Sequence, residues 1–487
     1  MGRPGPAAET AGSLPLAVGA MSLLIVLAAL CFLMLVAYRG YSVILFAPVA
    51  ALGAVLLTDP ALVAPMFTGL FMDKLVGFLK LYFPVFLLGA IFGKLVELSG
   101  FSRSIVAATI RVVGARRAML SIVLVCALLT YGGVSLFVVV FAVYPFAAEL
   151  FRQGDIPKRL IPGTIALGAF TFTMDALPGT PQIQNIIPTT FFGTTTWAAP
   201  WLGTLGAVFI LLVGLAWLEW RRLAALRRGE GYGDPAQLQN EPMEFHGGRP
   251  THPLLALLPL LVVGVANKLL TLWIPHAYGD SVSFVPAVVG NPAPVVQETS
   301  KLVAIWAVEG ALLAGIACVL LLAWRPVRAR FAEGSKAAIG GALLAGMNTA
   351  SEYGFGAVIA ALPGFLVVAN ALGSIPNPLV NEAVTVTALA GITGSASGGM
   401  SIALAAMSET FIANANAAGI PMEVLHRVAA MASGGMDTLP HNGAVITLLA
   451  VTGLSHRQAY KDIFAVTLIK TAAVFVVIGL YYAFGLT

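Results

Sequence analysis

Two short segments of the sequence carry the same arrangement of residues, Met-Asp-x-Leu-Pro, and each places an Asp inside an apolar stretch. The first is "TMDALPGTPQIQN" at residues 173–185, and the second is "GMDTLPHNGAVIT" at residues 435–447. Asp175 and Asp437 are their ionisable residues. A carboxyl group buried in an apolar medium favours its neutral form, so either Asp is a candidate to carry a proton across a membrane. The alternative is that each Asp only caps a helix end and never titrates.

His441 is a rival proton carrier, because it follows the second motif directly and imidazole titrates near physiological pH. A lone His is also often a hydrogen-bonded structural residue, and that alternative stays open. We take Asp437 as the first candidate.

The prolines of the two motifs predict a break in each helix. Pro178 and Pro440 each remove a backbone donor and disfavour helical geometry at the preceding Leu. A broken helix exposes free N–H groups and a positive dipole end, which can hold a carboxylate without a cation, and no Lys or Arg adjoins either motif. The side chains expected to bind the hydroxyl groups of a substrate are Ser135, Thr180, Gln182, Asn185, Ser401, His441 and Asn442.

The composition shows what kind of element must position these residues. The 487 residues are 59% hydrophobic and only 10% charged, and the mean hydropathy is +0.91. A soluble domain has about a quarter charged residues, so we expect an all-α polytopic membrane protein. Apolar spans of helical length are predicted at residues 15–38, 42–57, 75–98, 201–220, 253–274, 301–324 and 463–484.

A pair of glycines precedes each motif. Gly132 and Gly133 lie in "TYGGVS", and Gly398 and Gly399 lie in "SGGMS". The fourteen residues before the first pair make a helix of about 21 Å, too short for a hydrocarbon core of about 30 Å. We therefore expect a re-entrant helical hairpin with its tip at each glycine pair, and these glycines at the substrate site. The alternative is one long helix whose glycines pack against a neighbour.

The anchors Gly-Gly-x-Ser, Ile-Pro and Met-Asp-x-Leu-Pro recur in the same order, which predicts two repeats unless the match is accidental. Lys and Arg flank the first copy, whereas residues 337–426 contain neither, so the positive-inside rule predicts copies of inverted topology. The expected regions are N-terminal transmembrane helices (1–74), repeat 1 with a cytoplasmic-side hairpin (75–220), a cytoplasmic loop with connecting helices (221–336), and repeat 2 with an outer-side hairpin (337–487).

Other function classes have weaker support. The basic residues form no face with interleaved aromatics, which argues against nucleic acid binding. Cys31, Cys126 and Cys318 are widely spaced in apolar runs, so we expect neither disulfides nor a metal site, and no cofactor. An intramembrane enzyme would need a nucleophile beside a base, and only His441 lies near serines and a carboxylate. A passive channel is also less favoured, because paired intramembrane carboxylates favour coupled transport.

These motifs, together with "GTPQIQNIIPTTFFGTTTWAAPWLG" at residues 179–203, resemble the gluconate permease family of proton symporters. The resemblance covers nearly the whole chain after about Ser42. It implies proton-coupled uptake of gluconate or a related hydroxy acid across the inner (plasma) membrane of a bacterium, a homodimer in the lipid bilayer, and a mobile part that carries the hairpins.

One departure leaves the substrate open. Gluconate-specific members of that family have a His- and Pro-rich break in the first copy, where this chain has "MDALPGTPQ". A short hydroxy acid such as 3-hydroxybutyrate, or another carboxylate, remains an alternative. Sodium is the alternative coupling ion, because unwound carbonyls and hydroxyls at the hairpin tips can bind it.

Overall fold

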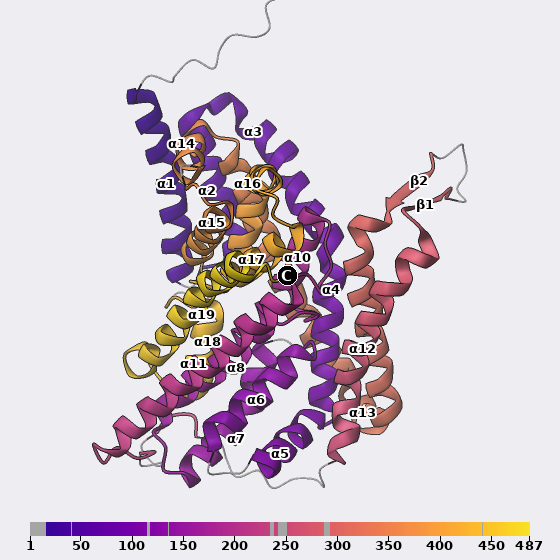
Figure 1. Ribbon diagram of the computed structural model, residues 1–487, viewed down its shortest axis with the longest axis vertical. Helices are drawn as coiled ribbons and strands as arrows, with labels where there is room; N and C mark the ends of the chain where they lie inside the picture. Colours follow the sequence, from indigo (N-terminus) through magenta and orange to yellow (C-terminus); the bar gives the residue numbers. More distant parts are fainter. Residues whose placement is uncertain are drawn as a thin grey trace, which may run out of the picture.

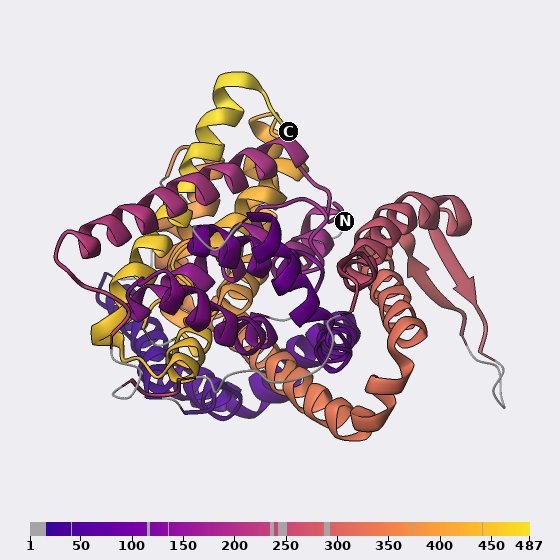
Figure 2. The same cartoon turned by 90° about the horizontal axis from the view of Figure 1, so that it is seen from below.

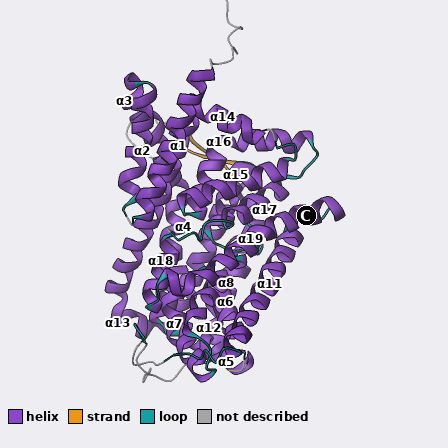
Figure 3. Cartoon of the chain, turned by 90° about the vertical axis from the view of Figure 1, so that its left-hand side faces the viewer, coloured by secondary structure: helices purple, strands orange, loops and turns teal. Residues whose placement is uncertain are grey.

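The chain folds as an all-α polytopic membrane protein, as its composition predicts (Figures 1 and 3). The computed structural model describes residues 16–39, 41–113, 117–134, 136–233, 238–241, 251–286, 293–373, 375–440 and 442–487. By length and composition, five helical segments within these ranges can each cross a membrane: Pro60–Leu98, Pro200–Leu226, Pro253–Tyr278, Thr299–Ala360 and His456–Phe484.

The first part of the chain, residues 16–226, begins with two helices and a series of short helical turns that continue into a third, longer helix. A short helix, a helical hairpin, a span broken into short pieces and one long helix follow. These are α1 (Leu16–Tyr38), α2 (Val43–Thr58), η1 (Pro60–Leu62), α3 (Val63–Pro65), η2 (Met66–Phe71), α4 (Met72–Leu98), α5 (Phe101–Val113), α6 (Ala118–Tyr131), α7 (Leu136–Gln153), η4 (Lys158–Leu160), α8 (Ile161–Ala169), α9 (Phe172–Asp175), α10 (Ile183–Phe192) and α11 (Pro200–Leu226).

The second part has a similar order of elements. It comprises α12 (Pro253–Tyr278), the antiparallel strands β1 (Ser281–Phe284) and β2 (Val295–Glu298), α13 (Thr299–Ala360), α14 (Pro363–Gly373), α15 (Pro378–Thr393), α16 (Ala396–Ala417), α17 (Met422–Ser433), α18 (Gly443–Thr452) and α19 (His456–Phe484). The two strands project away from the helices in both views (Figures 1 and 2).

The longest helix, α13, packs along α4. Its backbone leaves helical geometry at Ala323 and Arg330, so it has two segments joined at a kink. Glycines allow the second segment to approach α4 and the preceding η2 closely: Gly334 lies against Leu98 of α4, and Gly354 lies against Phe71 of η2. Residues 331–360 thus form a further membrane-length segment, in addition to the predicted spans.

The first helical hairpin has the turn that its glycine pair predicts. Helices α6 and α7 are joined at Gly132–Val134, where Gly133 has a φ of +92°. A Cβ on Gly132 would lie 2.9 Å or less from side-chain atoms of Leu260 on α12, so this position also needs a small residue.

The second hairpin turns four residues earlier than predicted. Helices α15 and α16 are joined at Gly394, which has a φ of +66°, and at Ser395, whose side chain caps α16 by accepting from the Gly398 N–H at 3.1 Å. Gly398 and Gly399 lie in the first turn of α16, so the prediction that they form the tip was wrong. A glycine pair inside a helix serves close packing, whereas the left-handed turn needs only Gly394.

The two hairpins lie in opposite halves of the molecule. In Figure 1, α6 and α7 occupy the lower half and α15 and α16 the upper half. The lower end carries α5, the end of α7 and the basic residues that follow it, so the positive-inside rule predicts that this end is cytoplasmic.

Each predicted helix break is present. The first span is non-helical from Ala176 to Gln182, between α9 and α10, and the second is non-helical between α17 and α18. Pro178 and Pro440 lie inside these breaks, as their backbone chemistry predicts.

The loop after α11 is held against this lower end by ion pairs. Lys158 lies 2.7 Å from Glu241, and Arg159 donates to Glu230 at 2.5 and 2.8 Å. Arg221, at the end of α11, is buried and donates to Asp462 on α19 at 2.6 Å. The described part of this loop is therefore attached to η4, between the first hairpin and the broken span, and α11 is attached to α19.

Acidification or neutralisation of Glu230 is expected to release this loop. The hydrogen bonds from Arg159 lower the pKa of Glu230 below its ordinary value of 4.5. The pair therefore stabilises the attached loop fully above pH 4.5, and this contribution is lost as the pH falls through the lowered pKa. At pH 7, Glu230→Gln should expose Arg227 and Arg228 to trypsin several-fold faster than in the wild type, as followed by mass spectrometry.

A control for this test is Glu219→Gln, because Glu219 pairs with Arg222 on the exposed surface of α11. Equal cleavage rates for the wild type and Glu230→Gln would show that the pair does not hold the loop.

Candidate functional site

The two helix breaks meet in the interior and bring both motif carboxylates together. Asp175 and Asp437 are 1% and 4% exposed. Asp175 is close enough to Asp437, Lys470 and Arg427 to interact electrostatically with all three. Asp175 packs against Gly434 at the end of α17, where a Cβ would lie 3.0 Å from the carboxyl carbon, and its Oδ2 has no hydrogen-bond partner among the described residues.

A buried lysine links the two breaks. Lys470 projects from α19, is 1% exposed, and forms an ion pair with Asp437. It also donates to the carbonyl oxygen of Phe170 at the end of α8, at 3.1 Å. The expectation that no cation lies at the site was therefore wrong. Lys470 is 33 positions from Asp437, and its only sequence signal is its position in the predicted span at 463–484.

A buried arginine holds the first break in place. Arg427 on α17 is fully buried, and its guanidinium donates four hydrogen bonds. Two go to the carbonyl oxygen of Ala198, at 2.7 and 3.3 Å, one goes to that of Asp175 at 3.0 Å, and one goes to Oδ1 of Asn185 at 3.1 Å. The second broken span thus supplies the donors that satisfy the irregular backbone around the first.

Two predicted substrate ligands have their polar atoms bonded within the protein. Thr180 donates to the carbonyl oxygen of Thr173 at 2.8 Å. The Asn185 amide donates to the carbonyls of Thr180 and Thr196, and its Oδ1 lies 3.1 Å from both Arg427 and His426. In this conformation both side chains stabilise the break.

The tip of the first hairpin binds the first break. Gln182 donates to the carbonyl oxygen of Thr130 at 2.7 Å, and Tyr131 donates to that of Pro178 at 2.9 Å. A Cβ on Gly133 would lie 3.2 Å from Pro181, so the tip is in close contact with the break. Gly132, Gly133 and Gln182 therefore lie together, and their role in binding a substrate stays a prediction.

The second hairpin binds the second break in the same way. Asn442 donates to the carbonyl oxygen of Gly394 at 2.7 Å, while its Oδ1 caps α18 by accepting from Val445 N–H at 2.9 Å. Ser401 lies in α16 away from the turn, and its buried hydroxyl has no hydrogen-bond partner among the described residues. Ser135 and His441 lie outside the described residues.

A buried glutamate also faces the second hairpin. Glu352 on α13 is 3% exposed, is hydrogen-bonded to Ser395, and has its Oε2 directly over Gly398. The lack of a side chain at Gly398 makes room for this carboxyl group. Gly398 and Gly399 therefore serve the packing of the hairpin against α13 and α15.

Comparison with known proteins supports a transporter over an intramembrane enzyme. No family model matches the sequence. The fold resembles the crystal structure of the Alcanivorax borkumensis YdaH transporter, which is described as having an unusual topology, with a TM-score of 0.50 and 15% identity over 96% of this chain and 98% of that one.

At the level of sequence, the chain is 59% identical over 473 residues to the uncharacterized transporter YxjC of Bacillus subtilis, across 96% of this chain and 100% of the relative. The chain therefore belongs to the same family of membrane transporters as YxjC.

Proposed function

We propose that the protein is a secondary active transporter that moves gluconate or a related hydroxy-carboxylate together with protons across the inner membrane of a bacterium. One observation supports coupling most strongly: two carboxylates and two cations, Asp175, Asp437, Arg427 and Lys470, are buried together where the two breaks meet.

The charge balance of this cluster argues for a coupled cation. With both Asp residues ionised, two negative charges balance two positive charges. A carboxylate substrate that enters this dry region adds an unbalanced negative charge, which costs several kcal/mol or more. A proton taken up by Asp437 or Asp175 restores neutrality, so the anion and the proton enter together.

The substrate class rests on the polar groups of the breaks and on the sequence resemblance. The N-terminal ends of α10 and α18 both begin at the breaks, and each presents backbone N–H groups suited to a carboxylate. Gln182, which lies at the first break and contacts the tip of the first hairpin, is a candidate ligand for a substrate hydroxyl. A homodimer is part of the proposal on the resemblance alone.

The decisive test is uptake of labelled gluconate and 3-hydroxybutyrate into proteoliposomes under an imposed pH gradient, with and without sodium. The wild type should accumulate one of these acids in response to the proton gradient. Asp437→Asn leaves a cluster with excess positive charge, so the anion binds without a proton. This variant should keep exchange of internal for external substrate and lose accumulation.

Two further variants complete the experiment. Asp59→Asn, in an exposed turn, should behave as the wild type. Asp437→Asn with Lys470→Met removes the uncompensated lysine and guards against misfolding of the single variant. Uptake that needs only sodium would replace the proposed coupling ion, and failure of both acids to move would refute the proposed substrate class.

A further inference from the structure

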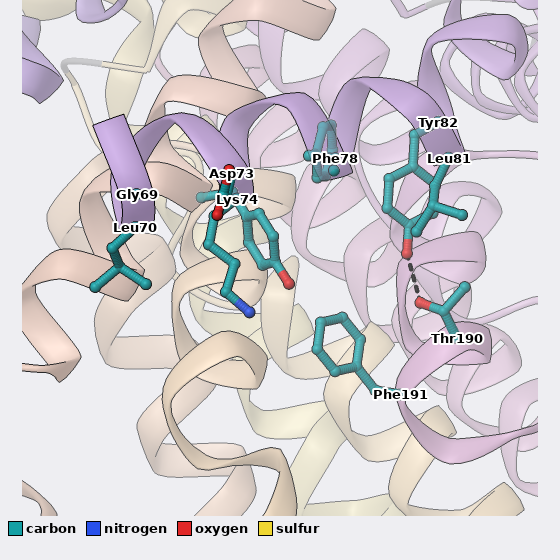
Figure 4. Close-up of a pocket in the computed structure, with 11 residues that line it drawn as sticks. Gly69, Leu70, Asp73, Lys74, Phe78, Leu81, Tyr82, Thr190 and Phe191 are labelled. Carbon is teal, nitrogen blue, oxygen red and sulfur yellow. Dashed lines mark hydrogen bonds between the residues drawn. The ribbon is translucent and has the colours of Figure 1, made fainter. Parts of the chain in front are cut away.

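A cavity of about 480 Å³ lies between α4, α10 and the second segment of α13 (Figure 4). Its polar lining comes from Asp73, Lys74 and Tyr82 on α4, Thr190 on α10, and Tyr353 on α13. The volume is within the usual range of small-molecule sites. The cavity is separate from the contacts between the hairpin tips and the breaks.

The cavity is at the outer end of the protein. Helix α4 runs from Met72 to Leu98, and its C-terminal end lies at the basic, cytoplasmic end (Figure 1). Roughly 36 Å of helix separates Lys74 from Leu98, more than the hydrocarbon thickness of about 30 Å. Lys74 and Asp73 are exposed, and this length of helix puts them at the outer water interface when Leu98 lies at the opposite one.

A hydrogen bond closes the floor of the cavity. The hydroxyls of Tyr82 and Thr190 lie 2.6 Å apart, joining α4 to α10 (Figure 4). Tyr82 is 2% exposed, so its ring is covered by the surrounding residues. From Thr190, α10 leads inward over roughly 12 Å to Gln182 and the first break. Tyr82 also donates to the carbonyl oxygen of Ile187 at 3.4 Å, so α4 is bonded to α10 at two points between the cavity and the first break.

The cavity carries a free cation at its mouth. Lys74 forms no ion pair with any residue that the structure describes, and Figure 4 shows its side chain extending from α4 into the space in front of Phe191. The ring of Tyr353 contacts both other aromatic rings of the lining, with centroids 5.7 Å from Phe78 and 6.5 Å from Phe191. A small anion with an apolar or hydroxylated body fits this combination.

We propose that this cavity is the outer vestibule of the transporter, in which Lys74 attracts the substrate carboxylate and the Tyr82–Thr190 contact is the gate to the breaks. The substrate class rests on the proposed function, whereas the vestibule and its charge do not. Asp73 opposes the attraction, so the local balance between Asp73 and Lys74 sets the affinity for an external anion.

The local charge can be measured without knowing the substrate. Gly77 lines the cavity, and a Cβ there meets no atom within 4 Å, so Gly77→Cys is tolerated sterically. Its reaction rate with an anionic methanethiosulfonate reagent should fall about threefold when Lys74→Gln is added, the effect of one charge across roughly 7 Å of water. The rate with a trimethylammonium reagent should rise.

The controls use the same chain. Lys80→Gln removes an exposed lysine of α4 that does not line the cavity and should change neither rate. The protein without the added cysteine reports the labelling of Cys31, Cys126 and Cys318. Gly69→Cys, another open position of the lining, replaces Gly77→Cys should that variant misfold.

Transport gives the second readout. Lys74→Gln should raise the KM for external substrate about threefold and leave Vmax unchanged, and Asp73→Asn should lower KM. The proposal that this cavity is a charged vestibule would be refuted if Lys74→Gln changed the reaction rate of neither reagent, or if it left KM unchanged. If neither acid is transported but the reagents respond as expected, the proposed substrate fails and the charged vestibule stands.

Discussion

Arg427→Met is expected to destabilise the protein severely and to abolish transport. The substitution keeps the apolar stem of the side chain and removes four hydrogen bonds in a fully buried position. The carbonyl oxygens of Asp175 and Ala198 lose this donor. Each buried polar group without a partner costs about 1–3 kcal/mol, so a total of roughly 3–5 kcal/mol is expected. That is a large share of the typical stability of a folded protein, about 5–15 kcal/mol.

The measurement is thermal unfolding of the detergent-solubilised protein, followed by size-exclusion chromatography, with Arg457→Met as the control. Arg457 is exposed at the start of α19, and its replacement should leave the melting temperature nearly unchanged. The melting temperature of Arg427→Lys should lie between those of Arg427→Met and the wild type, because one ammonium group cannot reproduce the planar guanidinium that reaches two backbone carbonyls. A melting temperature of Arg427→Met equal to that of the wild type would show that water replaces these bonds.

The features that sequence alone could predict depend on local chemistry. Pro178 and Pro440 act on their own backbone, so the breaks follow from the sequence. The first turn also follows, because its left-handed residue, Gly133, belongs to the visible glycine pair. In the second hairpin, a single Gly394 makes the turn, and the more conspicuous pair beside it packs against α15 and Glu352.

The features that sequence could not predict depend on contacts between distant segments. Arg427 reaches the first break from α17 and Lys470 reaches both breaks from α19, and the breaks contain cations only because these helices pack there. Thr180 and Asn185 were predicted as substrate ligands from their position, but their partners are backbone groups that become unsatisfied only when the first span unwinds. The partners of a polar residue at a break are set by the fold, whereas the break itself is set by the residue types.

Gly399→Ala is expected to disrupt the second hairpin. A Cβ at this position would lie 2.6 Å from the carbonyl carbon of Leu389 and closer still to the backbone of Ala390. Backbone atoms cannot rotate away as a side chain can, so α15 and α16 must separate near their turn. Overpacking of this kind costs about 1–3 kcal/mol, and we expect the upper end of the range because the obstacle is backbone.

Separation of the two arms would also displace Gly394, whose carbonyl oxygen accepts the 2.7 Å hydrogen bond from Asn442 at the second break. Gly399→Ala should therefore reduce both the melting temperature and the rate of substrate exchange. The matched control is Gly340→Ala in α13, where a Cβ meets nothing within 4 Å and Ala favours the helix by about 0.5–1 kcal/mol. Normal exchange in Gly399→Ala would mean that the two arms tolerate separation without moving the turn, and the contact between Gly394 and Asn442 would then not be required for transport.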